Sequence, residues 1–130
     1  VYVMDHGICN FLSFKMSKNL GRLLENIICI ELLREKSVNN KLEIYYWKDY
    51  KQNEVDFVIK EGEKVKNLIQ SCWDLSNIKT KEREIKALIK GSEELRCNNL
   101  LIITSDFEGE EKIEGKKIIY IPLWKWLIHD

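Results

Sequence analysis

The sequence predicts an α/β fold in which helices flank a mixed central sheet, and two observations predict it. Apolar residues recur with a helical period over residues 20–33 and again over residues 81–95. Short runs rich in β-branched and aromatic residues, bounded by polar turns, lie before, between and after these two helices. Strands and helices that alternate in this way along one chain favour a single sheet with helices packed on its faces.

The first half of the chain predicts four strands and one long helix. A strand opens the chain over residues 1–4, and Ser17 is the expected N-cap of the helix at 20–33. Three further strands, with polar turns between them, are expected over residues 43–47, 55–59 and 67–73.

The second half predicts a helix, two strands and a short closing helix. Thr80 is the expected N-cap of the helix at 81–95, and Glu82 and Glu84 in its first turn complement the helix dipole. The remaining elements are a buried strand, a charged loop, a second strand and a short apolar helix, expected in that order over residues 100–104, 106–114, 117–121 and 123–128.

Length and charge limit the possible functions. The chain has 130 residues, the size of one domain, and its 21 basic and 21 acidic side chains give a formal net charge of zero. Such a protein is not attracted to nucleic acid or anionic lipid over its whole surface, so any such site has to be a local patch. Because the chain lacks a phosphate-binding glycine loop and a G-x-S-x-G element, we expect these residues neither to hydrolyse nucleotides nor to form a serine-hydrolase site.

The four cysteines favour a reducing compartment. Cys9, Cys29, Cys72 and Cys97 form no C-x-x-C pair, and the two histidines lie near opposite ends of the chain, which disfavours a structural zinc site. Each cysteine lies in or beside an apolar run, where a free thiol packs as a small hydrophobic group. The sequence shows no signal peptide and no run of about 20 apolar residues. We therefore expect a soluble cytoplasmic protein with free thiols and no membrane partner.

Three polar residues interrupt apolar segments and are the candidate site residues. Glu25 interrupts the first long helix, Asp56 interrupts the strand at 55–59, and Gln70 interrupts the next strand. The two-residue period of a strand places Cys72 on the same face as Gln70. Burial of a carboxylate is costly unless a partner neutralises it, and Mg²⁺ held by carboxylate and carbonyl oxygens is one such partner.

The order of these residues, a helix glutamate, a hairpin aspartate and a polar pair on the next strand, resembles the PD-(D/E)xK nucleases. More closely, the chain resembles the nuclease-like C-terminal domain of unknown function in archaeal AAA+ ATP-binding proteins. The matching segments are residues 21–26, 46–48, 54–58, 68–72, 83–85 and 121–127. The resemblance implies a restriction-endonuclease-like core. It also implies that residues 1–130 are one C-terminal module of a longer AAA+ ATPase, with the ATP site and a linking winged helix elsewhere in that polypeptide.

The resemblance also assigns roles to the site residues. In active nucleases of this type, the hairpin aspartate and the glutamate of an E-x-K strand hold Mg²⁺, and the lysine assists the attacking water. Asp56 matches the aspartate and Glu25 the supporting helix acid, whereas Gln70 stands at the glutamate position and Cys72 at the lysine position. A neutral amide holds Mg²⁺ more weakly than a carboxylate does, and a thiol cannot replace an ammonium group. We therefore expect a catalytically degenerate module that binds nucleic acid or a partner protein.

Two other functions compete with this one. An active Mg²⁺-dependent DNA endonuclease would use Glu25, Asp56 and Gln70, with Lys79 or Lys81 in place of the missing lysine. A pure protein-interaction module would use the tryptophans near the C-terminus as anchors.

Four basic residues at helical spacing form a stripe on the second helix that could contact phosphate groups. They are Lys79, Arg83, Lys86 and Lys90.

Each candidate also has a simpler interpretation. The stripe is then a solvated helix face, Glu25 pairs with Arg22, and Asp56 is a hydrogen-bonded strand acid. Gln70 is a structural amide, and the four tryptophans are core or interface residues rather than base-stacking platforms.

Overall fold

The computed structural model describes residues 2–4 and 20–128, which form seven strands and three helices. The strands are β1 (Tyr2–Met4), β2 (Leu42–Lys48), β3 (Glu54–Glu61), β4 (Lys64–Cys72), β5 (Leu100–Thr104), β6 (Gly109–Ile113) and β7 (Lys116–Pro122). The helices are α2 (Leu20–Val38), α3 (Ile78–Leu95) and α4 (Leu123–Ile128).

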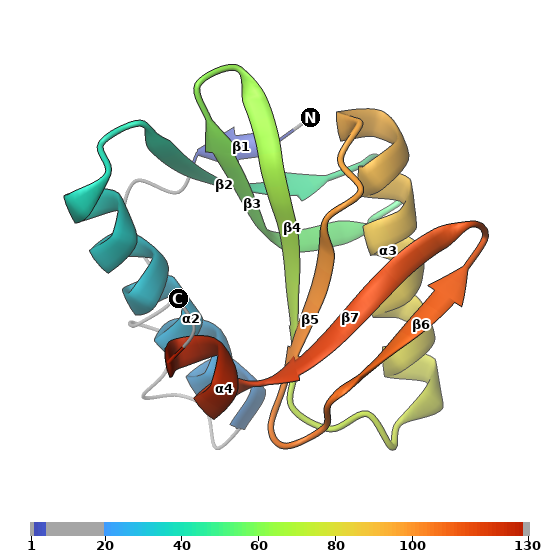
Figure 1. Cartoon of the computed structure of the whole chain (residues 1–130). Helices are drawn as coiled ribbons and strands as arrows, with labels where there is room; N and C mark the ends of the chain where they lie inside the picture. Colours follow the sequence, from blue (N-terminus) through green and yellow to red (C-terminus); the bar gives the residue numbers. More distant parts are fainter. Residues whose placement is uncertain (1, 5–19, 129–130) are drawn as a thin grey trace.

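The strands of the described residues form one mixed sheet in the order β1-β2-β3-β4-β5-β7-β6. Neighbouring strands from β1 to β4 are antiparallel, β4, β5 and β7 run parallel, and β6 is antiparallel to β7 at the edge. Helix α3 connects β4 to β5 across one face of the sheet, whereas α2 and α4 cover the other face (Figure 1). The predicted α/β fold, a mixed sheet flanked by helices, is confirmed.

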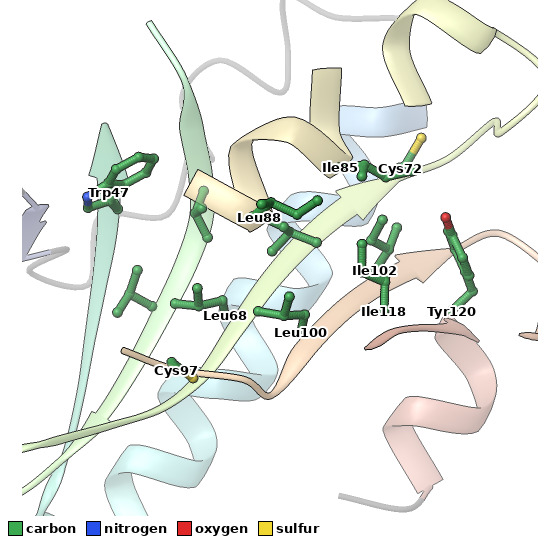
Figure 2. Close-up of a cluster of buried hydrophobic side chains, with 13 residues drawn as sticks. Trp47, Leu68, Cys72, Ile85, Leu88, Cys97, Leu100, Ile102, Ile118 and Tyr120 are labelled. Carbon is green, nitrogen blue, oxygen red and sulfur yellow. The ribbon is translucent and has the colours of Figure 1, made fainter. Parts of the chain in front are cut away.

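The sheet separates two hydrophobic cores. The core beneath α3 joins that helix to β2, β3, β4, β5 and β7 through residues that include Trp47, Leu68, Leu88 and Ile102 (Figure 2). The core on the other face joins α2 and α4 to the sheet through residues that include Leu24, Ile28, Phe57 and Trp126. Because both faces of the central strands are buried, these strands appear in the sequence as nearly continuous apolar runs.

Helix α2 is longer than the helix predicted over residues 20–33, since it continues through polar residues to Val38. Arg34 donates hydrogen bonds to both carboxylate oxygens of Glu31 one turn earlier, at 3.0 and 2.5 Å. Ion pairs at this spacing support exposed helical turns that carry no apolar signal. The predicted N-cap Ser17 lies outside the described residues.

The N-cap of α3 is Asn77, so the prediction of Thr80 is wrong. The Asn77 side chain accepts a hydrogen bond from the Thr80 main-chain N–H at 3.1 Å, and the helix begins at Ile78. Ile78 is exposed, and its neighbours in the first turn are polar. The first turn therefore lacks the apolar period from which the helix start was predicted.

The charged loop predicted over residues 106–114 contains an additional strand, β6, which pairs with β7. Its residues Glu110 and Lys112 are exposed. Charged side chains are typical of edge strands, where they prevent pairing with other chains. Because of these charges, the segment lacks the apolar residues from which a strand is predicted.

Cys72 and Cys97 are buried free thiols, as expected. Cys29 is disulfide-bonded, which corrects the expectation of free thiols throughout. An apolar environment accommodates both a free thiol and a disulfide. The apolar segments around the cysteines therefore could not show which of them are disulfide-bonded. Over the described residues, the structure contains no helix with the length and apolar character needed to cross a membrane.

Candidate functional site

A cleft of about 980 Å³ is bordered by α2, β3, the end of β4 and α3. It brings together Glu25 from α2, Asp56 from β3 and Cys72 from β4, three of the residues that the sequence singled out. Further acidic residues line the same cleft, namely Glu54, Asp74 and Glu84. Arg22 and Arg83 line it as well.

The cleft lies where the main-chain pairing of β3 with β4 ends. The last pair toward the cleft is Phe57 with Ile69. Beyond this pair, side chains take the place of the main-chain partners. The Asp56 carboxylate accepts hydrogen bonds from the Ser71 N–H at 2.9 Å and the Ser71 hydroxyl at 3.1 Å. The Asp56 N–H in turn donates to the side-chain oxygen of Gln70 at 2.8 Å.

Gln70 is fully buried and connects three segments. Its side-chain oxygen accepts from the Asp56 N–H, and its side-chain nitrogen donates to the main-chain oxygens of Glu54 at 2.8 Å and Glu84 at 3.2 Å. The side chain therefore fixes β4 to β3 and to α3. The arrangement matches a structural amide, in which each polar group is satisfied by the protein itself.

The carboxyl groups of the cleft raise one another's pKa. Burial raises the pKa of Asp56 well above its usual value, and the charges of Glu84 and Glu25 raise it further against the hydrogen bonds from Ser71. Burial also raises the pKa of Glu84 to about 7, a shift that Arg83 opposes and that Glu25 and Glu54 reinforce. Near pH 7, the Glu84 carboxyl group is therefore protonated in part, although it would be ionised in water.

Glu84 is a site residue that the sequence did not reveal, because an expected place in the first turn of the helix explained it by the helix dipole. Since α3 begins at Ile78, neither Glu82 nor Glu84 lies in its first turn, and that expectation is wrong. A usable signal was present. At 3.6 residues per turn, Glu84 falls on the same face of α3 as Leu88 and Gly91. Leu88 is fully buried, and a Cβ on Gly91 would lie 3.0 Å from Val55 of the sheet. An acid on the face of a helix that packs closely on a sheet is a candidate site residue.

Cys72, at the position where the nuclease resemblance expects a lysine, supplies no positive charge. Burial, followed by the charges of Glu84 and Asp74, raises the pKa of its thiol to about 11. The thiol is therefore neutral, and it donates to the main-chain oxygen of Asp74 at 3.5 Å.

Lys79 and Lys81, which could have replaced the missing catalytic lysine, do not line the cleft. The Lys81 ammonium lies 3.8 Å from a carboxylate oxygen of Glu111 and 5.6 Å from the centre of the Tyr120 ring. Lys81 borders a separate cavity of about 280 Å³ beyond the ends of β4 and β5. Lys79 is exposed on α3.

The acidic residues do not form a ready metal site. Across residues 2–4 and 20–128, no three His, Cys, Asp or Glu side chains are grouped closely enough to hold a metal ion. Of the three predicted magnesium ligands, Glu25 and Asp56 line the cleft, whereas Gln70 is buried with its hydrogen bonds directed to the protein. Proton binding by the cleft carboxyls would also compete with a cation.

The four basic residues of the stripe are exposed along α3. At 3.6 residues per turn they fall within a face about 60° wide. Arg83 lies at the edge toward the cleft, where its guanidinium is 3.6 Å from Glu84. Glu82 and Glu93 fall beyond the opposite edge of this face.

The tryptophans divide between the cores and the surface. Trp47 is buried and donates to the Glu94 carboxylate at 2.6 Å, and Trp126 is buried between α4 and the sheet. Trp73 is partly buried and lines the cleft. Trp124 is 60% exposed on α4. The core interpretation therefore holds for two of the four side chains.

Comparisons with known proteins place the chain in a family. An uncharacterized protein of Methanocaldococcus jannaschii, MJ1544, is 47% identical over 132 aligned positions, which cover 97% of this chain and 28% of that protein. The chain thus spans little more than a quarter of the length of this relative. No solved structure matches the chain. The family model of a domain of unknown function, DUF4143, matches residues 20–126, so the chain belongs to the DUF4143 family.

Proposed function

We propose that this chain is a catalytically degenerate PD-(D/E)xK-like module that binds nucleic acid without cleaving it. The observation that carries the proposal is the buried amide of Gln70. This side chain stands where a nuclease of this type needs a metal-binding carboxylate, and its polar atoms form hydrogen bonds with β3 and α3. A side chain committed in this way holds the two strands together and contributes no charge to the cleft.

The neighbouring positions support the same proposal. Cys72 offers a neutral thiol where an ammonium group would orient water and stabilise developing negative charge. Removal of one preorganised charged or hydrogen-bonding group from such a site costs about 10²- to 10³-fold in rate. Two such groups are replaced here, so we expect cleavage to fall below a useful rate.

The basic stripe on α3 supports nucleic-acid binding. The chain has no net charge, yet Lys79, Arg83, Lys86 and Lys90 place four positive charges on one face of a single helix. Contacts of such residues with phosphates release counterions and provide affinity without regard to base sequence. Asp74 also lines the cleft, and hydrogen bonds from Ser76 lower the pKa of its carboxyl group. This charged carboxylate would repel phosphates, so the outer face of α3 is the expected contact surface.

We also propose that the module is the C-terminal part of a longer cytoplasmic AAA+ ATPase, as its resemblance implies. The greater length of the M. jannaschii relative supports this architecture. Binding by the module would then hold the ATPase on its nucleic-acid substrate.

The test of the proposed function combines cleavage with binding. In a plasmid-nicking and branched-DNA assay with Mg²⁺ or Mn²⁺, we expect no difference between the wild-type chain and Asp56→Ala. Metal-dependent cleavage that Asp56→Ala abolishes would contradict the proposal and establish the nuclease alternative. The double variant Gln70→Glu with Cys72→Lys restores the carboxylate and the ammonium group, and the same assay shows whether DNA cleavage returns.

Binding is measured by retention on DNA with the four basic residues of the stripe changed to Glu. We expect retention to be lost, while circular dichroism shows a folded chain. Trp124→Ala is the matched control, because Trp124 is exposed on α4, across the sheet from α3. Retention that survives charge reversal would contradict nucleic-acid binding through α3. The protein-interaction alternative, for which the exposed Trp124 and Ile128 one turn apart are the candidate anchors, would then be favoured.

A further inference from the structure

The loop between β2 and β3 holds an exposed aromatic residue on a rigid support. Tyr50 is 88% exposed, the highest value among the large hydrophobic side chains described. The carboxylate of Asp49 accepts hydrogen bonds from the Lys51 N–H at 2.9 Å, the Asn53 N–H at 2.8 Å and the Asn53 side chain at 2.9 Å. Main-chain bonds from Asp49 to Asn53 and from Gln52 to Asp49, at 3.0 and 3.1 Å, close the loop. A single exposed aromatic is common, but one held outward by a closed loop is preorganised for contact.

This loop lies beside the basic face of α3. At one end, Trp47 of β2 donates to Glu94 in the last turn of the helix, and this hydrogen bond is the main cause of the lowered pKa of Glu94. The charge of Asp49 also acts on Glu94, in the opposite direction. At the other end, Gln52 lines the cleft together with Arg83. The loop therefore lies beside α3, near the stretch between Arg83 and Glu94 that carries Lys86 and Lys90.

The loop adds charge of the same sign as the stripe. Lys48 and Lys51 flank Tyr50 and are exposed. The Lys51 ammonium lies 6.0 Å from the centre of the Tyr50 ring, within range of a cation–π contact. The carboxylate of Asp49 accepts hydrogen bonds inside the loop, which lower its pKa and leave it charged. Two lysines and one aspartate therefore give residues 48–53 a net charge of +1. An aromatic ring is thus displayed among cations, beside a helix face that carries four more.

We propose that Tyr50 and the α3 stripe together bind single-stranded nucleic acid, with the Tyr50 ring stacked on an unpaired base. This inference rests on the proposed nucleic-acid-binding function and deepens it by naming the substrate class. Basic side chains that track the backbone, combined with an aromatic platform for bases, are the features by which proteins bind single strands without sequence preference. In a duplex the base faces are covered by their stacked neighbours, so the Tyr50 ring would gain little there.

The experiment measures the affinity of the 130-residue chain for an oligothymidine and for a duplex of equal length by fluorescence anisotropy at one fixed salt concentration. We expect tighter binding to the single strand. Tyr50→Ala should weaken single-strand binding about 5- to 150-fold, the range that corresponds to loss of one base–aromatic stack. Tyr50→Phe keeps the ring and should bind like the wild type. A fluorescent base analogue in the strand should be quenched by the wild type and by Tyr50→Phe, and not by Tyr50→Ala.

Two controls separate this inference from the function on which it rests. Trp124→Ala removes an exposed aromatic from α4 and should leave affinity unchanged. Reversal of the four stripe charges to Glu should abolish binding to both probes. If the charge reversal abolishes binding but Tyr50→Ala has no effect, or if the duplex binds more tightly, the stacking inference is overturned and the nucleic-acid function stands. If the charge reversal has no effect, the proposed function fails, and the stacking inference fails with it.

Discussion

Gln70 links three segments with one side chain, and its removal should show how much of the local structure depends on it. We predict that Gln70→Leu, which keeps the approximate volume, lowers the free energy of unfolding by about 2 to 4 kcal/mol. The leucine leaves the Asp56 N–H and the Glu54 and Glu84 carbonyls without their side-chain partner, and an unsatisfied buried polar group costs about 1 to 3 kcal/mol. Urea denaturation followed by circular dichroism measures the change.

Ser71→Ala is the matched control for this experiment. It removes the hydroxyl contact to Asp56 but keeps the hydrogen bond from the Ser71 main chain, so its cost should be only about 1 kcal/mol. A Gln70→Leu variant as stable as Ser71→Ala would show that the Gln70 amide does not fix β4 to β3 and α3.

Glu84 should make the stability of the fold depend on pH. Its pKa in the folded state is about 7, above the ordinary value of 4.5, so the folded state binds more protons than the unfolded state between these values. Stability is therefore complete below about pH 4.5 with respect to this group and falls as the pH rises toward 7. We predict that Glu84→Gln reduces this loss by about 3 kcal/mol at most, the equivalent of the raised pKa. Urea denaturation at a series of pH values measures it.

Asp56 contributes in the same direction, because its pKa is also raised. Some loss of stability with rising pH should therefore persist in Glu84→Gln. The control is Glu82→Gln, which changes an exposed acid on the outer side of α3 and should leave the pH profile unaltered. A wild-type profile that rises between pH 4.5 and 7 would be incompatible with the burial of these carboxyls.

At the scale of the element, the start of α3 can be tested through its cap. Asn77→Ala should destabilise the protein by about 1 kcal/mol, because the Thr80 N–H loses the side-chain oxygen that accepts from it. Thermal unfolding monitored by circular dichroism at 222 nm provides the measurement. Thr80→Ala, at the cap position that the sequence predicted, should cost less because Thr80 lies inside the helix. If the two costs were reversed, the helix would begin where the sequence predicted.

The elements show which signals a sequence carries and which it lacks. Long helices and buried strands were predicted because their apolar residues repeat with a fixed period. The cap of α3 was misplaced, because Asn77 and Thr80 are both capping residue types and the exposed Ile78 between them gives no period. Strand β6 was missed because its position at the edge of the sheet favours charged side chains over the alternation that marks a half-buried strand.

At the scale of the whole molecule, the response of the fold to divalent cations tests the degenerate cleft. An ion that binds only the folded chain raises the melting temperature in proportion to its occupancy. We predict that millimolar Mg²⁺ leaves the melting temperature of the wild type unchanged relative to NaCl of equal ionic strength. A rise of several degrees that disappears in Asp56→Ala would reveal a metal site and contradict the prediction.

The candidate site was predictable only in part. The sequence indicated that Glu25, Asp56 and Gln70 would meet, with Cys72 beside Gln70. Glu25, Asp56 and Cys72 line one cleft, whereas Gln70 does not. It left two roles open for Gln70, a metal ligand and a structural amide, because an amide that binds a ligand and an amide that binds the main chain occupy the same strand position. The role of Glu84 depends on how closely α3 approaches β3, and local sequence does not encode that distance.

The exchange of main-chain for side-chain partners at the end of β3 and β4 has a further consequence. The amide hydrogens of Asp56 and Ser71 lie beyond the last residues paired between β3 and β4, where amides without a main-chain partner normally exchange rapidly with solvent deuterium. Here both are held by side chains, Asp56 by Gln70 and Ser71 by Asp56. Their protection therefore reports on the integrity of the cleft wall rather than on the strand ladder. These two amides make the condition of the site visible by hydrogen exchange in the absence of any ligand or activity.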